Sequence, residues 1–331
     1  MRLSSVLVTG SSGFVGSALL SALNACGLRL SGLDLLPPTN PNLEKHFTGS
    51  VLDAPLVEKA TKGTDAIIHL AAAHKDFGVS REEYFQVNVD GTRTLLEAAS
   101  SLGVKTFVYF SSVAVYSPNR GTGPITESGE TRPTSDYGKS KLAAEEHVVR
   151  WAQAATDRQA LILRPTNIFG PENHHNLYRL IRTLDKGQFL RVGKLEGIKS
   201  IVYIGNVVAA TLHLLNRVQP GAKILNLIDE PSMTSWDLVQ EICHAGGFKV
   251  PRVRVPLSVV LPLGKILDGL AAASGRDFPI TGQRIKKLNT PSHFSAQGLL
   301  AEGFAAPYSL SQGIRNTVDW YKKTGSKPEA A

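Results

Sequence analysis

Tyr137 and Lys141 are the residues whose types and spacing most directly suggest chemistry. They are four positions apart at the start of an Ala/Glu/Lys-rich helical pattern, so both side chains lie on one helix face. A phenol titrates at about pH 10 in water, but a neighbouring ammonium and a nicotinamide cation both favour the phenolate and lower its pKa. The pair therefore predicts a general base for a hydroxyl proton. The alternative is that Tyr137 is half-buried packing and Lys141 is a solvated partner of Glu145.

Ser112 supplies a third polar group for the same chemistry. It follows the apolar run Thr106–Phe110, which is typical of a buried strand, so its hydroxyl lies at a strand end. There it could hydrogen-bond the same substrate hydroxyl as Tyr137. A Tyr-x-x-x-Lys spacing is common by chance, and the serine at a strand end is one of two features that favour a catalytic site. The other is a glycine-rich turn near the start of the chain.

Glycines at positions 10, 13 and 16 fall where the apolar run Val6–Val8 passes into a helical pattern over Ser17–Ala25. Glycines permit a tight turn and let backbone N–H groups approach a pyrophosphate, while the helix N-terminus favours the anion. A plain turn also explains such spacing, but the flanking strand and helix favour a dinucleotide site. The predicted cofactor contacts here are Gly10, Ser12, Gly13, Phe14, Val15 and Gly16.

Asp34 stands at the end of the second predicted strand, Leu28–Leu33, about 20 residues beyond the glycine turn. A carboxylate in this place accepts hydrogen bonds from an adenosine ribose, and its charge would repel a 2′-phosphate. The sequence therefore favours NAD over NADP. The alternative is that Asp34 caps the loop before Pro37 and Pro38.

The elements that must position these groups alternate between strands and helices. The predicted strands are Val6–Thr9, Leu28–Leu33, Ala66–Leu70, Thr106–Phe110 and Ala160–Leu163, with helices at Ser17–Ala25, Gly91–Ser101 and Tyr137–Ala155. This alternation predicts the α/β class, with a doubly wound parallel sheet covered on both faces.

The regular alternation of strands and helices ends at about residue 167. A basic helix over Leu177–Lys186 and a strand over Ser200–Ile204 are followed by a helix over Asn206–Leu215 and a strand over Ile224–Leu227. Because the last strand is expected to join the first domain's sheet, we predict an NAD-binding domain of residues 1–167 and 200–229. Residues 168–199 and 230–331 are predicted to form a smaller, discontinuous α/β substrate-binding domain.

Further motifs accompany these groups along the chain, at His69–Ala72, Asn88–Thr92, Ser111–Tyr116 and Arg164–Pro171. With the glycine turn and the Tyr137/Lys141 pair, they make the chain resemble an extended short-chain dehydrogenase/reductase of the NAD-dependent epimerase/dehydratase family. The resemblance implies a Rossmann domain with tightly bound NAD and a homodimer formed by paired helices.

The same resemblance assigns roles to individual residues. Tyr137 is implied as the base, Lys141 as the contact to the nicotinamide ribose, and Ser112 as the residue that positions the sugar hydroxyl. Asn88 is implied as a structural or water-holding residue near the site, and Asn167 as a contact to the substrate's diphosphate. Further implied cofactor contacts are Ser50, Val51, Leu70, Ala71, Ala72, His74, Pro165 and Asn167.

Departures from the family's motifs limit which of the family's reactions this chain is expected to catalyse. Dehydratases of this family carry an Asp-Glu pair after the serine, where this chain has Val113 and Ala114, so dehydration is not expected. Epimerase/reductases that make fucose nucleotides use a Cys in the Ala114 region, whereas the Ser-x-Ala-Val-Tyr pattern here resembles 4-epimerases. Ser50 replaces an Asp that touches adenine in many members. Lys199 replaces a phosphate-binding Arg and keeps its charge without bidentate geometry.

The C-terminal half resembles a narrower group, the O-antigen-cluster 4-epimerases that act on N-acetylglucosamine diphospho-undecaprenol. Segments 199–207, 284–287 and 306–313 carry this likeness, which implies substrate contacts at Lys199 and Arg284. The small Ser292 mildly favours an N-acetylated sugar. The implied activity is inversion of C4 of a diphosphate-linked (N-acetyl)hexosamine, carried by UDP or undecaprenol, through a 4-keto intermediate in surface polysaccharide biosynthesis such as that of lipopolysaccharide.

Two other functions stay open. A dehydrogenase or ketoreductase of a sugar or sterol-like alcohol is favoured by Tyr203–Val207, which also resembles that branch. Such an enzyme needs an exchangeable cofactor, whereas an epimerase retains its NAD. A non-catalytic NAD sensor typically lacks the Tyr/Lys pair, so Tyr137 and Lys141 argue against it.

Composition and charge limit the partners. The chain has 331 residues, 42% hydrophobic and 19% charged, which is typical of a globular protein of about two domains. Two distant cysteines argue against a disulfide framework, no metal site is predicted, and the absence of a signal-peptide pattern makes the cytoplasm the expected location.

The net charge of +8 lies in the second half, because residues 1–170 contain 16 Lys+Arg and 16 Asp+Glu and residues 171–331 contain 20 and 12. Backbone amides and a helix end can neutralise the phosphates of NAD, so the excess is assigned to a sugar diphosphate and not to nucleic acid. Basic and apolar residues are interleaved over 249–287. This segment predicts either peripheral contact with the inner face of an anionic membrane or an ordinary hydrophobic domain core.

Overall fold

A computed structural model describes residues 3–41, 43–74, 78–117, 123–256 and 289–324, and its contacts divide the chain into two compact units. Unit 1 comprises the described residues within Met1–Thr166, Ile204–Leu227 and Ser295–Pro307. Unit 2 comprises those within Asn167–Tyr203, Ile228–Phe294 and Tyr308–Ala331.

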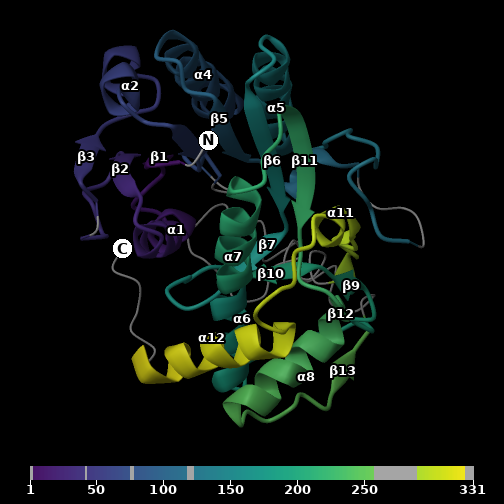
Figure 1. The fold of residues 1–331 in the computed structure, drawn as a ribbon. Helices are drawn as coiled ribbons and strands as arrows, with labels where there is room; N and C mark the ends of the chain where they lie inside the picture. Colours follow the sequence, from purple (N-terminus) through teal and green to yellow (C-terminus); the bar gives the residue numbers. More distant parts are fainter. Residues whose placement is uncertain (1–2, 42, 75–77, 118–122, 257–288, 325–331) are drawn as a thin grey trace. The chain divides into compact units, whose positions relative to one another are not determined.

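A seven-stranded sheet forms the centre of unit 1, with the strand order β11-β6-β5-β4-β1-β2-β3 and every pair parallel (Figure 1). Its strands are β1 (Ser5–Thr9), β2 (Arg29–Asp34), β3 (Lys45–Thr48), β4 (Ala66–His69), β5 (Thr106–Phe110), β6 (Gln159–Pro165) and β11 (Gly221–Leu227). The strand order reverses between β1 and β4, and sheets of this kind bind ligands beyond the carboxyl ends of their strands at such a switch point. The predicted α/β fold with a doubly wound parallel sheet is confirmed.

Helices cover both faces of this sheet. The helices α1 (Phe14–Ala25) and α7 (Ile204–Leu215) pack together on one face, and α2 (Ala54–Thr61), α4 (Gly91–Ser101) and α5 (Asp136–Gln153) lie on the other (Figure 1). A short helix α3 (Arg81–Phe85) and a π-helical turn η1 (Gln86–Asp90) lead directly into α4, and a 3-10 turn η2 (Val113–Val115) follows β5. The helix α11 (Gln297–Ala301) packs against β11.

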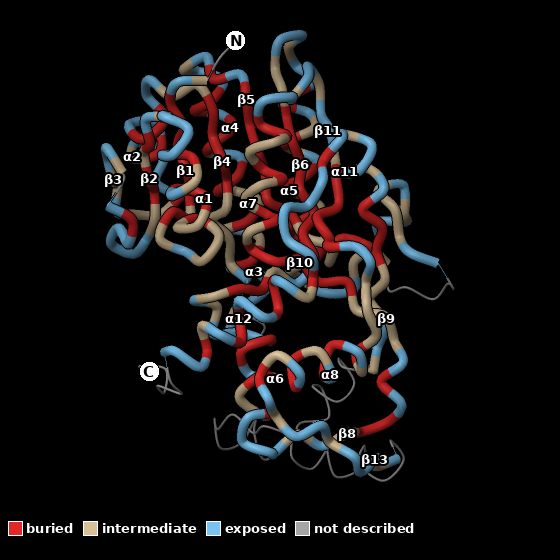
Figure 2. Tube along the Cα trace, turned by 60° about the horizontal axis from the view of Figure 1, so that its bottom comes forward, coloured by how far each residue is buried: buried red, intermediate tan, exposed pale blue. Residues whose placement is uncertain are grey.

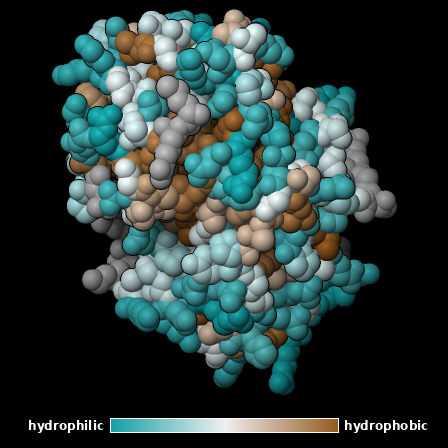
Figure 3. Space-filling model, viewed as in Figure 1, coloured by the Kyte–Doolittle hydropathy of each residue, from teal (hydrophilic) through white to brown (hydrophobic). Residues whose placement is uncertain are grey.

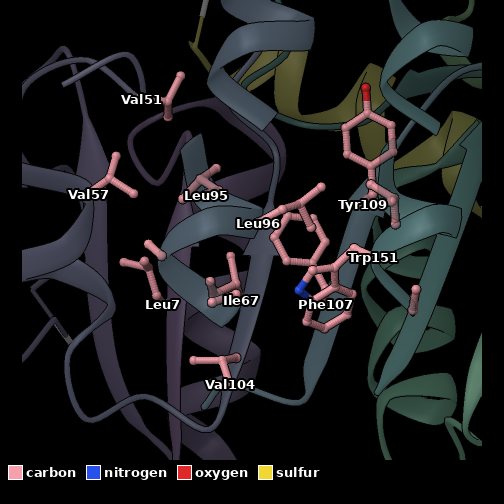
Figure 4. Packing of buried hydrophobic residues seen from close by; sticks show 14 of the residues in the cluster. Leu7, Val51, Val57, Ile67, Leu95, Leu96, Val104, Phe107, Tyr109 and Trp151 are labelled. Carbon is pink, nitrogen blue, oxygen red and sulfur yellow. The ribbon is translucent and has the colours of Figure 1, made fainter. Parts of the chain in front are cut away.

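The largest hydrophobic core lies between the sheet and the helices α2, α4 and α5. Alternate residues of neighbouring strands, such as Leu7, Ile67 and Phe107, pack there against Leu95 of α4 and Trp151 of α5 (Figure 4). The central strands β1, β4 and β5 are accordingly buried along their whole length (Figure 2). Burying one large apolar side chain contributes about 1.5–3 kcal/mol, so this layer fixes the strand ends that carry the polar groups.

The described residues of unit 2 form three short strand pairs and three helices. The strand β7 (Asn167–Phe169) pairs with β10 (Ile201–Tyr203), β9 (Ile198–Lys199) with β12 (Met233–Thr234), and β8 (Arg191–Val192) with β13 (Arg254–Val255). The helices are α6 (Asn176–Asp185), α8 (Ser235–Gly246) and α12 (Leu310–Thr324). The helix α12 packs against α8 and α6 through its buried face, and its outer face is hydrophilic (Figure 3).

The unit boundaries lie within two residues of the predicted domain boundaries at 167 and 229 and differ more at two other places. Residues 200–203 lie in unit 2, because β10 pairs with β7 and not with the seven-stranded sheet. The segment Ser295–Pro307 returns to unit 1, where the backbone N–H of Ser295 donates to the carbonyl of Ile125 at 2.9 Å. Glu302, in the same segment, forms an ion pair of 2.5 Å with Lys223 of β11.

Candidate active site

Gly10 and Gly16 form the tightest part of the turn between β1 and α1. Gly10 has a φ of +69°, and a Cβ there would lie 2.8 Å from the backbone N of Ala71. A Cβ on Gly16 would lie 2.2 Å from the carbonyl oxygen of Gly10. Both positions therefore require glycine. The helix α1 has no acidic residue in its first turn, so its N-terminus keeps a positive potential beside this cradle, as a dinucleotide pyrophosphate requires.

The Asp34 carboxylate lies beside this turn at the end of β2. It accepts a hydrogen bond from the backbone N–H of Ser12 at 2.9 Å and another from that of Leu36 at 3.0 Å. The second contact is the loop cap that the sequence offered as an alternative. An ionised carboxylate has about four acceptor positions, so these two bonds leave capacity for ribose hydroxyls. The ribose contact stays a prediction.

The segment after β4 borders the same turn. The backbone N–H of Leu70 donates to the carbonyl of Thr9 at 3.1 Å, and that of Ala71 donates to the Thr9 hydroxyl at 3.3 Å. His74 is exposed, and its Nδ1 lies 3.2 Å from the carbonyl oxygen of Ala72. The other two cofactor contacts implied in this region, Ser50 and Val51, follow β3, and the Val51 side chain is buried.

Asn88 connects this segment to α5. Its side-chain oxygen accepts from the backbone N–H of Ala73 at 2.8 Å, and its side-chain nitrogen donates to the Ala73 carbonyl at 3.1 Å and to the Ser140 hydroxyl at 2.9 Å. The Ser140 hydroxyl in turn donates to the carbonyl of Tyr137 at 2.8 Å. Asn88 is buried, so these contacts give it a structural position between the predicted cofactor segment and the predicted catalytic helix.

Ser112 and Tyr137 are brought to the same end of the sheet by a close backbone approach. Ser112 follows β5, and its hydroxyl accepts from the N–H of Ala114 at 3.2 Å. A Cβ on Gly138 would lie only 2.3 Å from the Ala114 carbonyl oxygen, so the first turn of α5 rests directly on the turn after Ser112. Gly138 is the next residue after Tyr137, and its missing side chain is what lets the two elements meet.

We expect Gly138→Ala to weaken both stability and activity. The added methyl group pushes the start of α5 away from Ala114, and such overpacking costs about 1–3 kcal/mol in the free energy of unfolding. A displacement of about 1 Å can cost up to about 10²-fold in rate, so kcat/KM should fall at least about tenfold. Urea unfolding and steady-state kinetics measure the two effects. Lys139→Ala, at the exposed neighbouring position, is the control, and equal behaviour of the two variants would contradict the close approach.

Lys141 is buried, with 2% of its surface exposed, and its Nζ lies 4.2 Å from the ring centroid of Tyr109. Burial lowers the pKa of Lys141 to about 7, and the charge of Glu145 opposes this shift. Glu145 itself forms a bidentate pair with Arg164, with distances of 2.9 Å from Nε to Oε1 and 2.5 Å from Nη2 to Oε2. The alternative that Lys141 is a solvated partner of Glu145 is therefore wrong.

The other residues predicted to contact substrate, and the cofactor contact predicted at Pro165, lie elsewhere in the chain. Asn167 is exposed at the start of β7, and Lys199 lies in β9, where its ammonium donates to the carbonyl of Thr290 at 2.5 Å; both belong to unit 2. Pro165 ends β6 in unit 1, and Arg284 lies outside the described residues. The structure thus places Ser112, the Tyr137/Lys141 pair and the glycine turn in unit 1. Asn167 and Lys199, whose contact with a diphosphate stays a prediction, lie in unit 2.

Sequence reasoning missed several residues around Lys141. Tyr109 and Phe107 both belong to an apolar strand pattern, which gives no sign that one of the two rings contacts an ammonium. Arg164 is the first residue of the motif Arg164–Pro171. Its pairing with Glu145 is a contact between β6 and α5 that sequence spacing does not reveal. Gly138 could have been identified from the sequence, because a glycine in the first turn of a predicted helix indicates that another segment of backbone approaches closely there.

Comparison with known proteins identifies the relatives of this chain. A family model described as the NAD dependent epimerase/dehydratase family matches residues 6–227. An N-acetyl-alpha-D-glucosaminyl-diphospho-ditrans,octacis-undecaprenol 4-epimerase from Escherichia coli O157:H7 is 34% identical, over 95% of this chain and 94% of that protein. A 3 beta-hydroxysteroid dehydrogenase/Delta 5-->4-isomerase from Mycobacterium tuberculosis is 31% identical, over 77% of this chain and 72% of that protein.

A solved structure shares the fold. The UDP-glucose 4-epimerase of Thermus thermophilus, in complex with NAD, is 25% identical and superposes with a TM-score of 0.75, covering 97% of this chain and all of that one. The glycine cradle, the helix end without an acid and the carboxylate of Asp34 together fit the phosphates and ribose of such a cofactor.

Proposed function

The chain belongs to the NAD dependent epimerase/dehydratase family, and we propose that it inverts C4 of a diphosphate-linked N-acetylhexosamine through a 4-keto intermediate. Membership of this family makes NAD the cofactor and makes the chain an NAD-dependent sugar epimerase of the extended short-chain dehydrogenase/reductase type. The observation that carries the proposal is the grouping of Ser112, Tyr137 and a buried Lys141 at the carboxyl end of the sheet that also bears the glycine turn.

Tyr137 and Ser112 move and hold the proton in the proposed reaction. The Tyr137 oxygen accepts the proton of the C4 hydroxyl while the Ser112 hydroxyl holds the same oxygen by a hydrogen bond, and Tyr137 returns the proton when the alcohol re-forms. The ammonium of Lys141 favours the phenolate that this exchange requires. Bound NAD supplies the acceptor and then the donor of the C4 hydride. Because the hydride is returned, the reaction consumes no second substrate.

The absence of an acid after Ser112 supports epimerisation over dehydration. Water elimination needs a group that protonates the departing hydroxyl, and Val113 and Ala114 follow the serine. The Escherichia coli relative, named for a polyprenyl-linked N-acetylglucosamine, supports an N-acetylhexosamine on a diphosphate carrier. We place the reaction in surface polysaccharide biosynthesis on the same ground.

The experiment is an incubation without added NAD. Purified protein is mixed with UDP-N-acetylglucosamine or with N-acetylglucosamine diphospho-prenol, and inversion at C4 is followed by ¹H NMR. We expect at least one sugar to invert, because an epimerase keeps its cofactor. If neither sugar inverts while added NAD is steadily reduced by an alcohol, the epimerase proposal is wrong.

The second candidate function is an NAD-dependent dehydrogenase or reductase of a sugar or sterol-like alcohol. The 31% identity with the mycobacterial hydroxysteroid dehydrogenase favours it. The two functions differ in cofactor use, since a dehydrogenase consumes added NAD in proportion to product. The NMR incubation with and without added NAD therefore separates them.

We further propose peripheral contact with an anionic membrane surface, which a polyprenyl carrier would require. In the described part of the segment 249–287, Lys249, Arg252 and Arg254 are exposed, and Val250 and Val253 expose 42% and 73% of their surface. The part of this segment from 257 onward lies outside the described residues, and no described helix is both long and apolar enough to span a bilayer.

Sedimentation with vesicles of anionic lipid tests this contact. We expect the double variant Arg252→Ala/Arg254→Ala to bind about 30-fold more weakly, because each basic residue near such a surface contributes about 1 kcal/mol. Arg217→Ala/Lys223→Ala, which removes two cations from unit 1, is the control. Equal binding of the double variant and the unchanged protein would exclude this surface as the contact.

A further inference from the structure

Tyr109 lies in β5 with its side chain fully buried, and the ammonium of Lys141 sits over the face of its ring at 4.2 Å. The face of an aromatic ring attracts a cation, and the attraction is strongest where both groups are removed from water. The Tyr109 hydroxyl points away from Phe107 and Trp151, which belong to the same hydrophobic layer (Figure 4).

We propose that Tyr109 is a positioning residue, whose ring holds the Lys141 ammonium charged and in place beside Tyr137. The proposal rests on the proposed function in one respect, because it takes Lys141 as part of the catalytic pair. It assigns Tyr109 no contact with substrate or cofactor. Its action passes through Lys141 alone.

The other charged and titratable groups facing Lys141 do not replace this contact. On α5 these are Tyr137, one turn before, and Glu145, one turn after. Glu145 is the counter-charge, but both of its oxygens are engaged by Arg164 of β6. The ring of Tyr109 therefore stabilises an ammonium whose counter-charge, Glu145, is already paired with another cation.

His69 of β4 completes this environment as a neutral ring. Its centroid lies 5.6 Å from that of Tyr109. The Thr92 hydroxyl donates to the carbonyl of Asn88 at 2.6 Å, so the Thr92 oxygen accepts from Nε2–H of His69 at 3.0 Å, while Nδ1 accepts from the Thr9 hydroxyl at 2.7 Å.

Burial and the charge of Lys141 lower the pKa of His69 to about 3. The imidazole therefore stays uncharged at neutral pH, and no second cation competes for the Tyr109 ring from this side. Protonation of the imidazole would add one, and it would break the hydrogen bond that Nδ1 accepts from the Thr9 hydroxyl.

Loss of the Tyr109 ring is expected to lower the pKa of Lys141. Removing the ring destabilises the ammonium relative to the neutral amine, so the pH at which Lys141 loses its proton falls. Below that pH the change has no effect on the charge of Lys141. The alkaline side of the pH profile of kcat/KM should move to lower pH, because Tyr137 loses the neighbouring charge that favours its phenolate.

The decisive measurement is the titration of Lys141 in the full chain, without substrate. Protein labelled with ¹³Cε-lysine is titrated by NMR, and the Lys141 resonance is assigned by its loss in Lys141→Met. We expect the midpoint to fall by about one pH unit in Tyr109→Leu, which corresponds to about 1.4 kcal/mol, and to stay in place in Tyr109→Phe. Phe107→Leu removes a ring from the same strand and face, and serves as the control for loss of core packing.

A second series avoids any loss of volume. Tyr109 is replaced by phenylalanine and by 3,5-difluorophenylalanine, whose ring has nearly the same size but a weaker attraction for cations, and the difluoro ring should lower the midpoint further. Equal midpoints across this series, or an equal shift in Tyr109→Leu and Phe107→Leu, would overturn the proposal. Since no sugar is needed, a failed epimerase assay leaves this result standing on its own.

Discussion

Replacing Tyr137 by phenylalanine should reduce turnover by about 10²–10⁴-fold, the range that a general base usually contributes, while NAD binding is retained. The substitution removes only the oxygen that exchanges the C4 proton. The ring packs against that of Tyr84, with centroids 6.0 Å apart, and phenylalanine keeps this packing. Neither the glycine turn nor the contacts of Asn88 involve the Tyr137 hydroxyl.

Two measurements separate this effect from a folding defect. C4 inversion is followed by NMR, and NAD released by denaturing the purified variant is quantified by its absorbance. Lys139→Ala, two residues further along α5 and exposed, should keep both properties. A Tyr137→Phe variant with more than about a tenth of the original turnover would remove Tyr137 from the role of base.

The elements that carry the site could be predicted because their patterns are strong. The predicted Thr106–Phe110 and Gly91–Ser101 coincide with β5 and α4, where a fully buried strand and a one-sided apolar helix give clear signals. The strand β3 and the helix α2 were not predicted. The former has four residues with no buried member, and the latter has only eight residues, too few to show a clear helical period.

The candidate catalytic residues could be proposed from sequence, but their surroundings could not be predicted. Tyr137 and Lys141 are recognised by a local spacing on one helix. The contacts of Lys141 with Tyr109, and of Glu145 with Arg164, join residues far apart in the chain that the parallel sheet aligns. A single sequence carries no record of such pairings. The same limit applies to Ser295–Pro307, whose contacts with unit 1, including those with Ile125 and Lys223, join residues far apart in the chain.

Arg164→Met should be the most destabilising of the substitutions considered, by about 3–5 kcal/mol in the free energy of unfolding. Only 4% of the Arg164 side chain and 3% of that of Glu145 are exposed, so the substitution leaves a buried carboxylate without its partner. Arg164 also donates to the Tyr116 hydroxyl at 2.9 Å, which in turn donates to the side-chain oxygen of Asn226 at 2.7 Å. Although burial opposes it, the bond to Glu145 raises the pKa of Arg164 above its ordinary value, so the guanidinium stays charged.

We expect the loss of stability in Arg164→Met to come from the broken ion pair and not from lost packing of the arginine side chain. The double variant Glu145→Leu/Arg164→Met distinguishes these two causes. Removing both charges leaves no unpaired ion, so the double variant should recover most of the stability lost in Arg164→Met. Urea unfolding followed by circular dichroism measures the free energies of unfolding of the two variants and of the unchanged protein. A double variant as unstable as the single one would show that packing around Arg164, rather than charge pairing with Glu145, holds β6 against α5.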